Sequence, residues 1–281
     1  MSICIVTDST ADIPREQAQA LGITVVPLTV FFGDEAYLDG VELDNAAFYK
    51  KLQASRVSPG TSQPSPASFQ EAYLKLIQDG AKAILSVHLS SKLSGTFQSA
   101  CAGRDALPDD AKKIPIEIID SESVSLGMGY PVMKAAEEAR EGVGMEELKT
   151  HLLDRLSRVR IMFVLDTLEY LKRSGRIGNA RALLGNMLSV KPILSLKNGQ
   201  VVPLEQPRTR SKAFARIAQM VGEMKKPEHL MIVESEQEVG EQLASALKDV
   251  YTATIPTYKL GAVIGTHTGP GTAGAVVIAS N

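Results

Sequence analysis

Tryptophan is absent from the chain, and aromatic residues make up only 5% of it. Proteins that bind single-stranded nucleic acid stack bases on aromatic side chains, so a surface of that kind is hard to build here. The formal net charge is −2 at pH 7, which gives no global positive field for nucleic acid or anionic lipid. We therefore expect no nucleic-acid partner and an interior made of aliphatic side chains.

Metal-binding patterns are also missing. The chain has two cysteines, Cys4 and Cys101, both in apolar surroundings, and no CxxC pair. Its four histidines are scattered, and no two of them have the HxxxH spacing of a zinc-binding helix. We expect the cysteines to be buried and reduced. The sequence predicts no metal site and no cofactor.

Two catalytic signatures and two targeting signals are absent as well. The P-loop pattern GxxxxGK[ST] and the serine-hydrolase elbow GxSxG do not occur. No apolar run reaches the roughly 18 residues that a membrane-spanning helix needs. The first residues, MSICIVTDST, lack the positive segment of a signal peptide. We expect a cytoplasmic protein without a membrane span.

What the first half does contain is an alternation of short apolar runs and helical patterns. ICIVTD (3–8), AKAILSVHL (81–89) and PIEIID (115–120) are predicted to be buried strands. Alternation of this kind favours a parallel sheet with helices on its faces. A chain of 281 residues is long enough for two cores. We therefore predict an N-terminal parallel-sheet α/β domain over 1–158.

The second half, 159–281, is predicted to be an α+β domain with a mixed sheet. KPILSLKNGQVVPLEQ (191–206) indicates a hairpin that turns at Asn198-Gly199. The C-terminal run GAVIGTHTGPGTAGAVVIA (261–279) is apolar, then polar and rich in glycine, then apolar again. We interpret it as strand, loop and strand.

Three segments are rich in hydroxyl groups and flank predicted elements: GTSQPSP (60–66), SSKLSGT (90–96) and GTHTGPGT (265–272). Hydroxyls and free N–H groups at a helix start favour a carboxylate or a phosphate. The same residue types also cap helices and form turns where no ligand binds. Two catalytic interpretations stay open: a hydrolase using Ser94 and His267, and a phosphotransfer protein in which His267 carries the phosphoryl group.

The sequence resembles the DegV family of bacterial fatty-acid-binding proteins. The motifs that carry the resemblance run in family order along nearly the whole chain: VTDSTADIP (6–14), VPLTVFFGDEAYLDG (26–40), TSQPSP (61–66), SSKLSGTFQSA (90–100), IIDSESVSLGMG (118–129), LEYLKRSGRIG (168–178) and GTHTGPG (265–271). TSQPSP alone is a weak signal, whereas LEYLKRSGRI and the full set are specific.

This resemblance implies a binding protein and no enzyme. A long-chain fatty acid is expected to lie in a buried aliphatic tunnel, with its carboxylate at the interface of the two domains. Family members of this type present that carboxylate to a fatty acid kinase, which makes an acyl phosphate. The resemblance also implies that the serine at position 94 holds the carboxylate and attacks nothing.

The resemblance and the hydroxyl-rich loops together give the expected site residues. The set expected to bind the carboxylate is Thr61, Ser62, Ser94, Gly95, Thr96, Thr266 and His267. Arg173 of the KRSGR motif is expected in the same polar network. Arg208 and Arg210 of PRTRSKA are expected to face the kinase.

Overall fold

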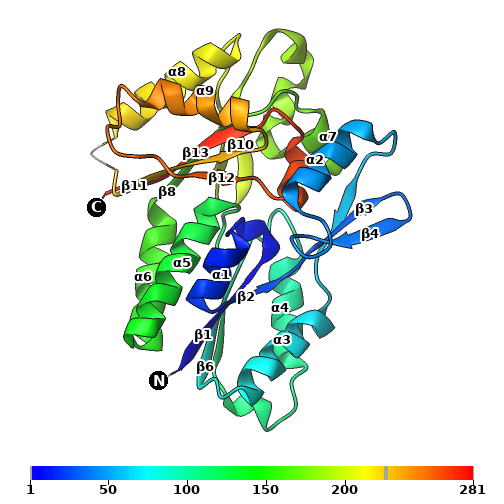
Figure 1. Cartoon of the computed structure of the whole chain (residues 1–281), viewed down its shortest axis with the longest axis vertical. Helices are drawn as coiled ribbons and strands as arrows, with labels where there is room; N and C mark the ends of the chain where they lie inside the picture. Colours follow the sequence, from blue (N-terminus) through cyan, green and yellow to red (C-terminus); the bar gives the residue numbers. More distant parts are fainter. Residues whose placement is uncertain (1, 225–226, 281) are drawn as a thin grey trace.

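The computed structural model describes residues 2–224 and 227–280, apart from the side chains of residues 184–189. The molecule is elongated, and two sheets with their helices lie one above the other (Figure 1). The lower sheet in that view is parallel and the upper one is mixed. The predicted fold class, with a parallel sheet in the N-terminal part and a mixed sheet in the C-terminal part, is therefore confirmed.

The N-terminal part is built on a four-stranded parallel sheet in the order β2-β1-β6-β7. Its strands are β1 (Ile3–Asp8), β2 (Ile23–Val26), β6 (Ala83–His88) and β7 (Ile116–Asp120). All six residues of β6 are buried, which explains its continuous apolar sequence. The carboxyl ends of the strands point toward the upper sheet (Figure 1), so the loops that follow them face the C-terminal part.

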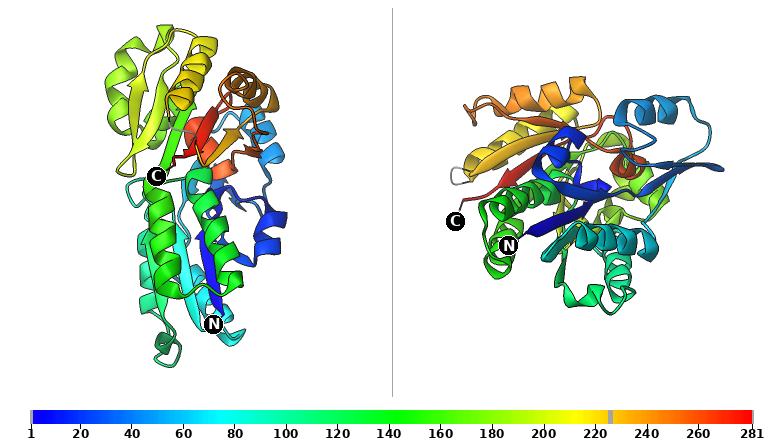
Figure 2. Two further views of the ribbon diagram at one scale, coloured as in Figure 1. Left: turned by 90° about the vertical axis from the view of Figure 1, so that its left-hand side faces the viewer. Right: turned by 60° about the horizontal axis from the view of Figure 1, so that its bottom comes forward.

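Helices cover both faces of this sheet (Figure 2). One face carries α1 (Arg15–Leu21), α5 (Leu126–Glu141) and α6 (Met145–Arg158), and the other carries α3 (Pro66–Gln78) and α4 (Thr96–Asp105). Short 3-10 turns, η1 (Ser9–Ala11) and η2 (Ala111–Lys113), follow β1 and precede β7. In the described part of the chain, every helix is too short or too polar to cross a bilayer.

The C-terminal part has a six-stranded sheet in the order β10-β9-β8-β13-β11-β12. Its strands are β8 (Val159–Val164), β9 (Ile193–Lys197), β10 (Gln200–Glu205), β11 (His229–Glu234), β12 (Thr257–Lys259) and β13 (Ala273–Ile278). Two helices, α8 (Arg210–Glu223) and α9 (Gln237–Leu247), cover one face, and the other face packs on α5 and α6. Between β8 and β9 lie α7 (Glu169–Ser174) and η3 (Gly178–Ser189).

The predicted hairpin is present. β9 and β10 pair antiparallel and turn at Asn198 and Gly199, whose φ angles are 51° and 74°. Positive φ at both central residues is what an Asn-Gly turn supplies at little steric cost. The prediction is therefore confirmed at the level of individual residues.

One predicted strand is wrong, because the run before the glycine-rich loop forms a helix, α10 (Ala262–Thr268). Valine, isoleucine and threonine favour strands in general, which explains the wrong prediction. Here the hydroxyls of Thr266 and Thr268 donate to the carbonyls of Ala262 and Ile264, four residues earlier, and satisfy helical backbone acceptors. The outcome matters because α10 carries His267.

A segment of the N-terminal part packs on that helix. β3 (Thr29–Phe32), β4 (Glu35–Leu38) and β5 (Gly60–Ser62) form a small antiparallel sheet, next to α2 (Asn45–Ala54). β5 lies at the start of the hydroxyl-rich segment GTSQPSP (60–66). The core of this unit includes Ala262 and Val263 of α10. Packing thus crosses the boundary between 158 and 159, and the division of the chain there stays a prediction.

Candidate functional site

A cavity lies between the two sheets. Fourteen of its lining residues are apolar: Leu28, Leu89, Leu93, Val124, Ile161, Phe163, Leu171, Leu196, Val201, Val233, Leu260, Val263, Ile264 and Val276. Its seven polar lining residues are Thr61, Ser94, Ser125, Arg176, His267, Thr268 and Thr272. The lining is therefore predominantly apolar.

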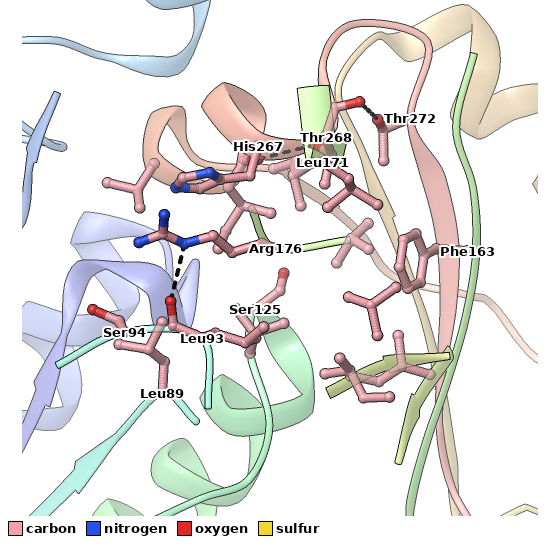
Figure 3. A pocket seen from close by; sticks show the side chains of 18 of the residues that line it. Leu89, Leu93, Ser94, Ser125, Phe163, Leu171, Arg176, His267, Thr268 and Thr272 are labelled. Carbon is pink, nitrogen blue, oxygen red and sulfur yellow. Dashed lines mark hydrogen bonds between the residues drawn. The ribbon is translucent and has the colours of Figure 1, made fainter. Parts of the chain in front are cut away.

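The polar groups are not spread evenly around the cavity. Ser94, Arg176 and His267 lie toward one end of it, and Phe163 lies toward the other (Figure 3). The hydroxyls of Thr268 and Thr272 donate to backbone carbonyls of their own segment, so their protons are not available to a ligand. The cavity therefore has one polar end and an apolar remainder.

His267 and Thr61 meet at the polar end. Thr61 lies on β5, where it pairs with Val30 of β3, and His267 lies on α10. Thr61 Oγ1 and His267 Nε2 are 2.9 Å apart, within hydrogen-bond distance. Sequence reasoning singled out both residues, and the fold brings them together across the two parts of the chain.

The imidazole of His267 is neutral near pH 7. Burial, and secondly the positive charge of Arg176, lower the pKa of His267 to about 4. Nδ1 is buried and has no hydrogen-bond partner in the described part of the protein. A buried polar atom without a partner costs free energy, so Nδ1 is poised to bond a ligand.

Ser94 belongs to the turn between β6 and α4. Its Oγ accepts from the Thr96 N–H at 3.3 Å and lies 2.9 Å from Thr96 Oγ1. Gly95 of this turn lies against the segment that carries Thr61: a Cβ on Gly95 would come within 2.5 Å of the Gln63 side-chain amide. The two predicted hydroxyl-rich loops are therefore in contact.

The arginine of the site is Arg176, which sequence reasoning missed. It follows α7, lines the cavity and donates from Nε to the Leu93 carbonyl at 3.2 Å. The predicted residue, Arg173, is exposed: its guanidinium donates to Ser58 Oγ and lies over the Tyr170 ring. The structure thus places Arg173 outside the cavity lining, because α7 and its Gly175 end direct position 173 to the surface and position 176 inward. A helical projection of LEYLKRSGRI alone could not place the residue beyond Gly175.

The remaining predicted residues lie outside the cavity lining. Ser62 is exposed, and Thr266 is buried with its hydroxyl bonded to the Ala262 carbonyl. Thr96 and Gly95 support Ser94 without lining the cavity themselves.

The two arginines expected to face a partner differ in exposure. Arg208 is exposed. Arg210 is half-buried, and its guanidinium donates to Asp166 Oδ1 and to the Gly271 carbonyl. Its contacts make Arg210 a support for the glycine-rich loop after α10.

The geometry bears on the two catalytic interpretations. Ser94 Oγ is engaged by Thr96 and His267 Nε2 by Thr61, and no carboxylate in the described residues bonds His267. Within those residues, no cluster of three or more metal-ligating side chains occurs. GPGTAG (269–274) has the spacing GxGxxG but leads into the strand β13, so it offers no helix N-terminus for a pyrophosphate.

Comparison with known proteins gives consistent results. A model of the DegV family, described as uncharacterised proteins, matches residues 2–280. A DegV domain-containing protein from Streptomyces coelicolor is 38% identical over 281 residues, which cover 98% of each chain.

Solved structures of the same family share the fold. A fatty acid-binding DegV family protein from Thermus thermophilus has a TM-score of 0.87 at 35% identity, with both chains fully covered. A stearic acid-binding protein from Eubacterium ventriosum has a TM-score of 0.89 at 25% identity, covering 98% of this chain and 97% of the other. The family model matches nearly the whole chain, and the Streptomyces coelicolor relative is 38% identical to it. The chain therefore belongs to the DegV family.

Proposed function

We propose that this protein binds a long-chain fatty acid in the cavity and presents its carboxylate to a fatty acid kinase for acyl phosphate formation, with no catalysis of its own. The observation that carries the proposal is the polar end of an otherwise apolar cavity. Family members with the same fold that bind fatty acid, including stearic acid, support it.

The polar end suits a carboxylate. A carboxylate that leaves water needs two or three donors, or its desolvation costs several kcal/mol. Ser94 and the Nδ1–H of neutral His267 can supply two such donors, while Thr61 donates its hydroxyl proton to His267 Nε2 and so favours that tautomer, and Arg176 adds positive charge beside them. Arg176 Nε donates to the Leu93 carbonyl and is not available to the ligand. The positive charge of the guanidinium still attracts the carboxylate electrostatically.

The apolar remainder suits an acyl chain. Each buried CH₂ group contributes about 0.8 kcal/mol, so a chain of a dozen or more carbons is a strong ligand. Thr268 and Thr272 donate their hydroxyl protons to backbone carbonyls. These two polar residues beyond the head group therefore have little need of water as a partner. A straight, unsubstituted chain fits this lining better than one with polar substituents.

A carrier fits the site better than a hydrolase or a phosphotransfer protein. A histidine whose pKa lies near 4 is a weak general base at neutral pH, and no carboxylate among the described residues orients it. The same histidine bonds Thr61, which suits a residue that holds an oxyanion more than one that carries a phosphoryl group.

The fatty acid part is tested by extracting purified protein with organic solvent and identifying the lipid by mass spectrometry. We expect a long-chain fatty acid at near-stoichiometric amount, and a higher melting temperature when palmitate or oleate is added to delipidated protein. Hexadecanol is the matched probe, because it has the chain without the carboxylate and should stabilise less. Protein that contains no fatty acid and ignores both acids contradicts the proposal.

The kinase part needs a separate reconstitution with a fatty acid kinase, ATP and loaded protein. We expect acyl phosphate to form, and the Arg208→Glu variant to form it more slowly with fatty acid binding unchanged, because Arg208 is exposed and lies outside the cavity lining. Arg210→Glu is a less clean variant, since it also breaks the ion pair with Asp166. Unchanged acyl phosphate formation by Arg208→Glu argues against that docking face.

A further inference from the structure

Ser90 begins the turn that carries Ser94, residues 90–95, which we call the head-group turn. Its side chain is completely buried. The Ser90 carbonyl accepts from the Leu93 N–H at 2.9 Å and from the Ser94 N–H at 3.2 Å. These two bonds fix the backbone of the turn relative to its first residue. The position of Ser90 therefore sets the position of Ser94, the hydroxyl donor proposed for the carboxylate.

The Ser90 hydroxyl reaches the C-terminal part of the chain. Its Oγ donates to the Gly199 carbonyl at 2.8 Å and accepts from the Lys92 N–H at 3.2 Å. Gly199 lies at the tip of the β9–β10 hairpin, 109 positions further along the sequence. A hydroxyl without solvent needs partners in the protein, and Ser90 gives its proton to the hairpin.

The hairpin and the head-group turn approach each other closely at this bond. A Cβ at Gly199 would lie 2.2 Å from Ser90 Oγ. The hydroxyl would then have to turn away, and its bond to the Gly199 carbonyl would be lost. The φ angle of Gly199 is 74°, in the region that favours glycine, so the turn and the contact both suit this residue.

The hairpin also forms part of the wall around the apolar remainder of the cavity. In the described chain, β9 pairs with β8 only through its first two residues. Beyond them, Leu196 of β9 and Val201 of β10 line the cavity. Both share one cluster of apolar side chains with Phe163, which lies toward the end away from the head group (Figure 3). The tip of the same hairpin bonds the head-group turn.

Ser90 bonds a third segment of the cavity wall as well. Its N–H donates to the Ser123 carbonyl at 2.9 Å, and the next two residues, Val124 and Ser125, line the cavity. The backbone of Ser90 is thus anchored in the N-terminal part, whereas its hydroxyl is bonded to the C-terminal part. One buried residue joins the wall around the acyl chain to the turn that carries the head-group donor.

We propose that Ser90 is a positioning residue that couples the two ends of the cavity: an acyl chain that packs on Leu196 and Val201 holds the hairpin, and the hairpin fixes the head-group turn through the Ser90 hydroxyl. This inference rests on the proposed function for its ligand. It deepens that function by making recognition of the carboxylate depend on the length of the chain. The coupling is reciprocal, so head group and tail contribute more together than separately.

The test measures the dissociation constants of palmitate, hexadecanol, decanoate and decanol. At each chain length, the ratio of the alcohol's constant to the acid's reports recognition of the carboxylate. In wild type we expect this ratio to be about fivefold larger for the longer pair, as for one neutral hydrogen bond. Ser90→Ala should make the two ratios equal. A merely structural loss would weaken all four ligands alike and leave the difference between the ratios unchanged.

Ser91→Ala is the matched control. Ser91 is the neighbouring serine, and its backbone N–H, which alanine keeps, donates to Asp120 Oδ1. This variant should retain the wild-type difference between the two ratios. Equal ratios in wild type overturn the proposal, and so does an Ser90→Ala protein in which the longer pair keeps its larger ratio.

Gly199→Ala breaks the same bond from the side of the hairpin. Its control is Gly22→Ala at the end of α1, because Gly22 has a φ angle of 69° and open space around it. The control therefore carries the backbone strain without the close contact. Gly199→Ala should equalise the two ratios, and Gly22→Ala should not. If Ser90→Ala does not fold, Gly199→Ala decides, and a retained difference between its ratios overturns the proposal.

Urea unfolding without ligand separates this inference from the proposed function. In the double variant Ser90→Ala/Gly199→Ala, the atom that the new Cβ meets is gone. Gly199→Ala should therefore lower the urea midpoint less in the Ser90→Ala background than in wild type. If wild type binds neither acid, the fatty-acid proposal fails, and this comparison still decides whether Ser90 holds the hairpin. Equal losses in the two backgrounds overturn that role.

Discussion

Thr61 Oγ1 and His267 Nε2 lie 2.9 Å apart, although the two residues are 206 positions apart in the sequence. One belongs to an edge strand of the small antiparallel sheet and the other to a seven-residue helix near the C-terminus. The polar end of the cavity exists only when these two parts of the chain are packed together. The predictions below use this arrangement.

Replacing Thr61 by valine removes the hydroxyl while preserving the shape of the side chain. His267 Nε2 loses the hydroxyl that favours the tautomer with its N–H at Nδ1, so the carboxylate loses a fixed donor and palmitate affinity should fall by about 1–3 kcal/mol in titration calorimetry. Ser62→Ala is the matched control, because the neighbouring hydroxyl is exposed. Equal losses in the two variants contradict the assignment of Thr61.

Arg176→Ala and Arg173→Ala separate the two arginines of one motif. Arg176→Ala should weaken palmitate binding by about 1.5–3 kcal/mol, because the carboxylate loses a nearby cation. Arg173→Ala should change it by less than about 0.5 kcal/mol, as for an ordinary surface substitution. Hexadecanol carries no charge and should bind both variants as it binds wild type. A larger effect at 173 than at 176 restores the original sequence prediction.

Asp39 should make the ligand-free protein less stable as pH rises. Its folded pKa of about 6 lies above the ordinary value of 3.8, so its contribution to stability is fully present below about pH 4 and is lost as pH rises through 6. The shift of about two units corresponds to roughly 3 kcal/mol as an upper figure. Asp39→Asn should lack this loss in urea unfolding measured from pH 4 to 8. Parallel curves of unfolding free energy against pH for variant and wild type contradict this role of Asp39.

His267 should have the opposite pH dependence. Its folded pKa of about 4 lies below 6.5, so it contributes stability above pH 6.5 that is lost as pH falls toward 4. His267→Asn should flatten the acid side of the urea-unfolding profile. A carboxylate ligand beside the ring should raise its pKa, which ¹³C-labelled histidine reports by NMR when palmitate is added. An unaltered titration on loading places the head group elsewhere.

Gly261→Ala tests the crowding at the start of α10. The added Cβ meets Asp12 Oδ1, so Asp12 must move and its bonds to Gly261 and Ser125 weaken. Gly144→Ala is the control: Gly144 is also an N-cap glycine with negative φ, at the start of α6, and has open space around it. We expect about 1–3 kcal/mol less stability for Gly261→Ala, as for an overpacked site, and little change for Gly144→Ala. Similar melting temperatures for the two variants contradict the close approach.

The parallel layer could be predicted from the sequence because its signals are local. β6 is buried at every residue and reads as one apolar run, and Asn198-Gly199 has the residues that its turn requires. The region of α10 could not, because its composition favours a strand while a tertiary hydrogen bond from the Gly261 N–H to Asp12 holds the start of a helix. Long-range contacts of this kind leave no local pattern.

The site shows the same division. Hydroxyl-rich loops are visible in the sequence, and the fold places Thr61, Ser94 and His267 around one cavity. The choice between Arg173 and Arg176 depended on where α7 ends, because Arg173 lies on α7 and is exposed whereas Arg176 follows the helix and lines the cavity. Asp12, which accepts from the Gly261 N–H at the start of α10, carried no signal, since lone aspartates near turns are common.

The small sheet and α2 bury their apolar side chains against Ala262 and Val263. On the ribosome, about 200 residues are added between the end of that sheet and α10, which takes roughly 10 to 40 s at ordinary elongation rates. During that interval Val30, Phe48 and Leu52 have no α10 to cover them. A nascent chain of this protein is therefore expected to need protection from aggregation until its last helix emerges. A ligand can first be bound when the finished chain is released, and not already when the N-terminal sheet is complete.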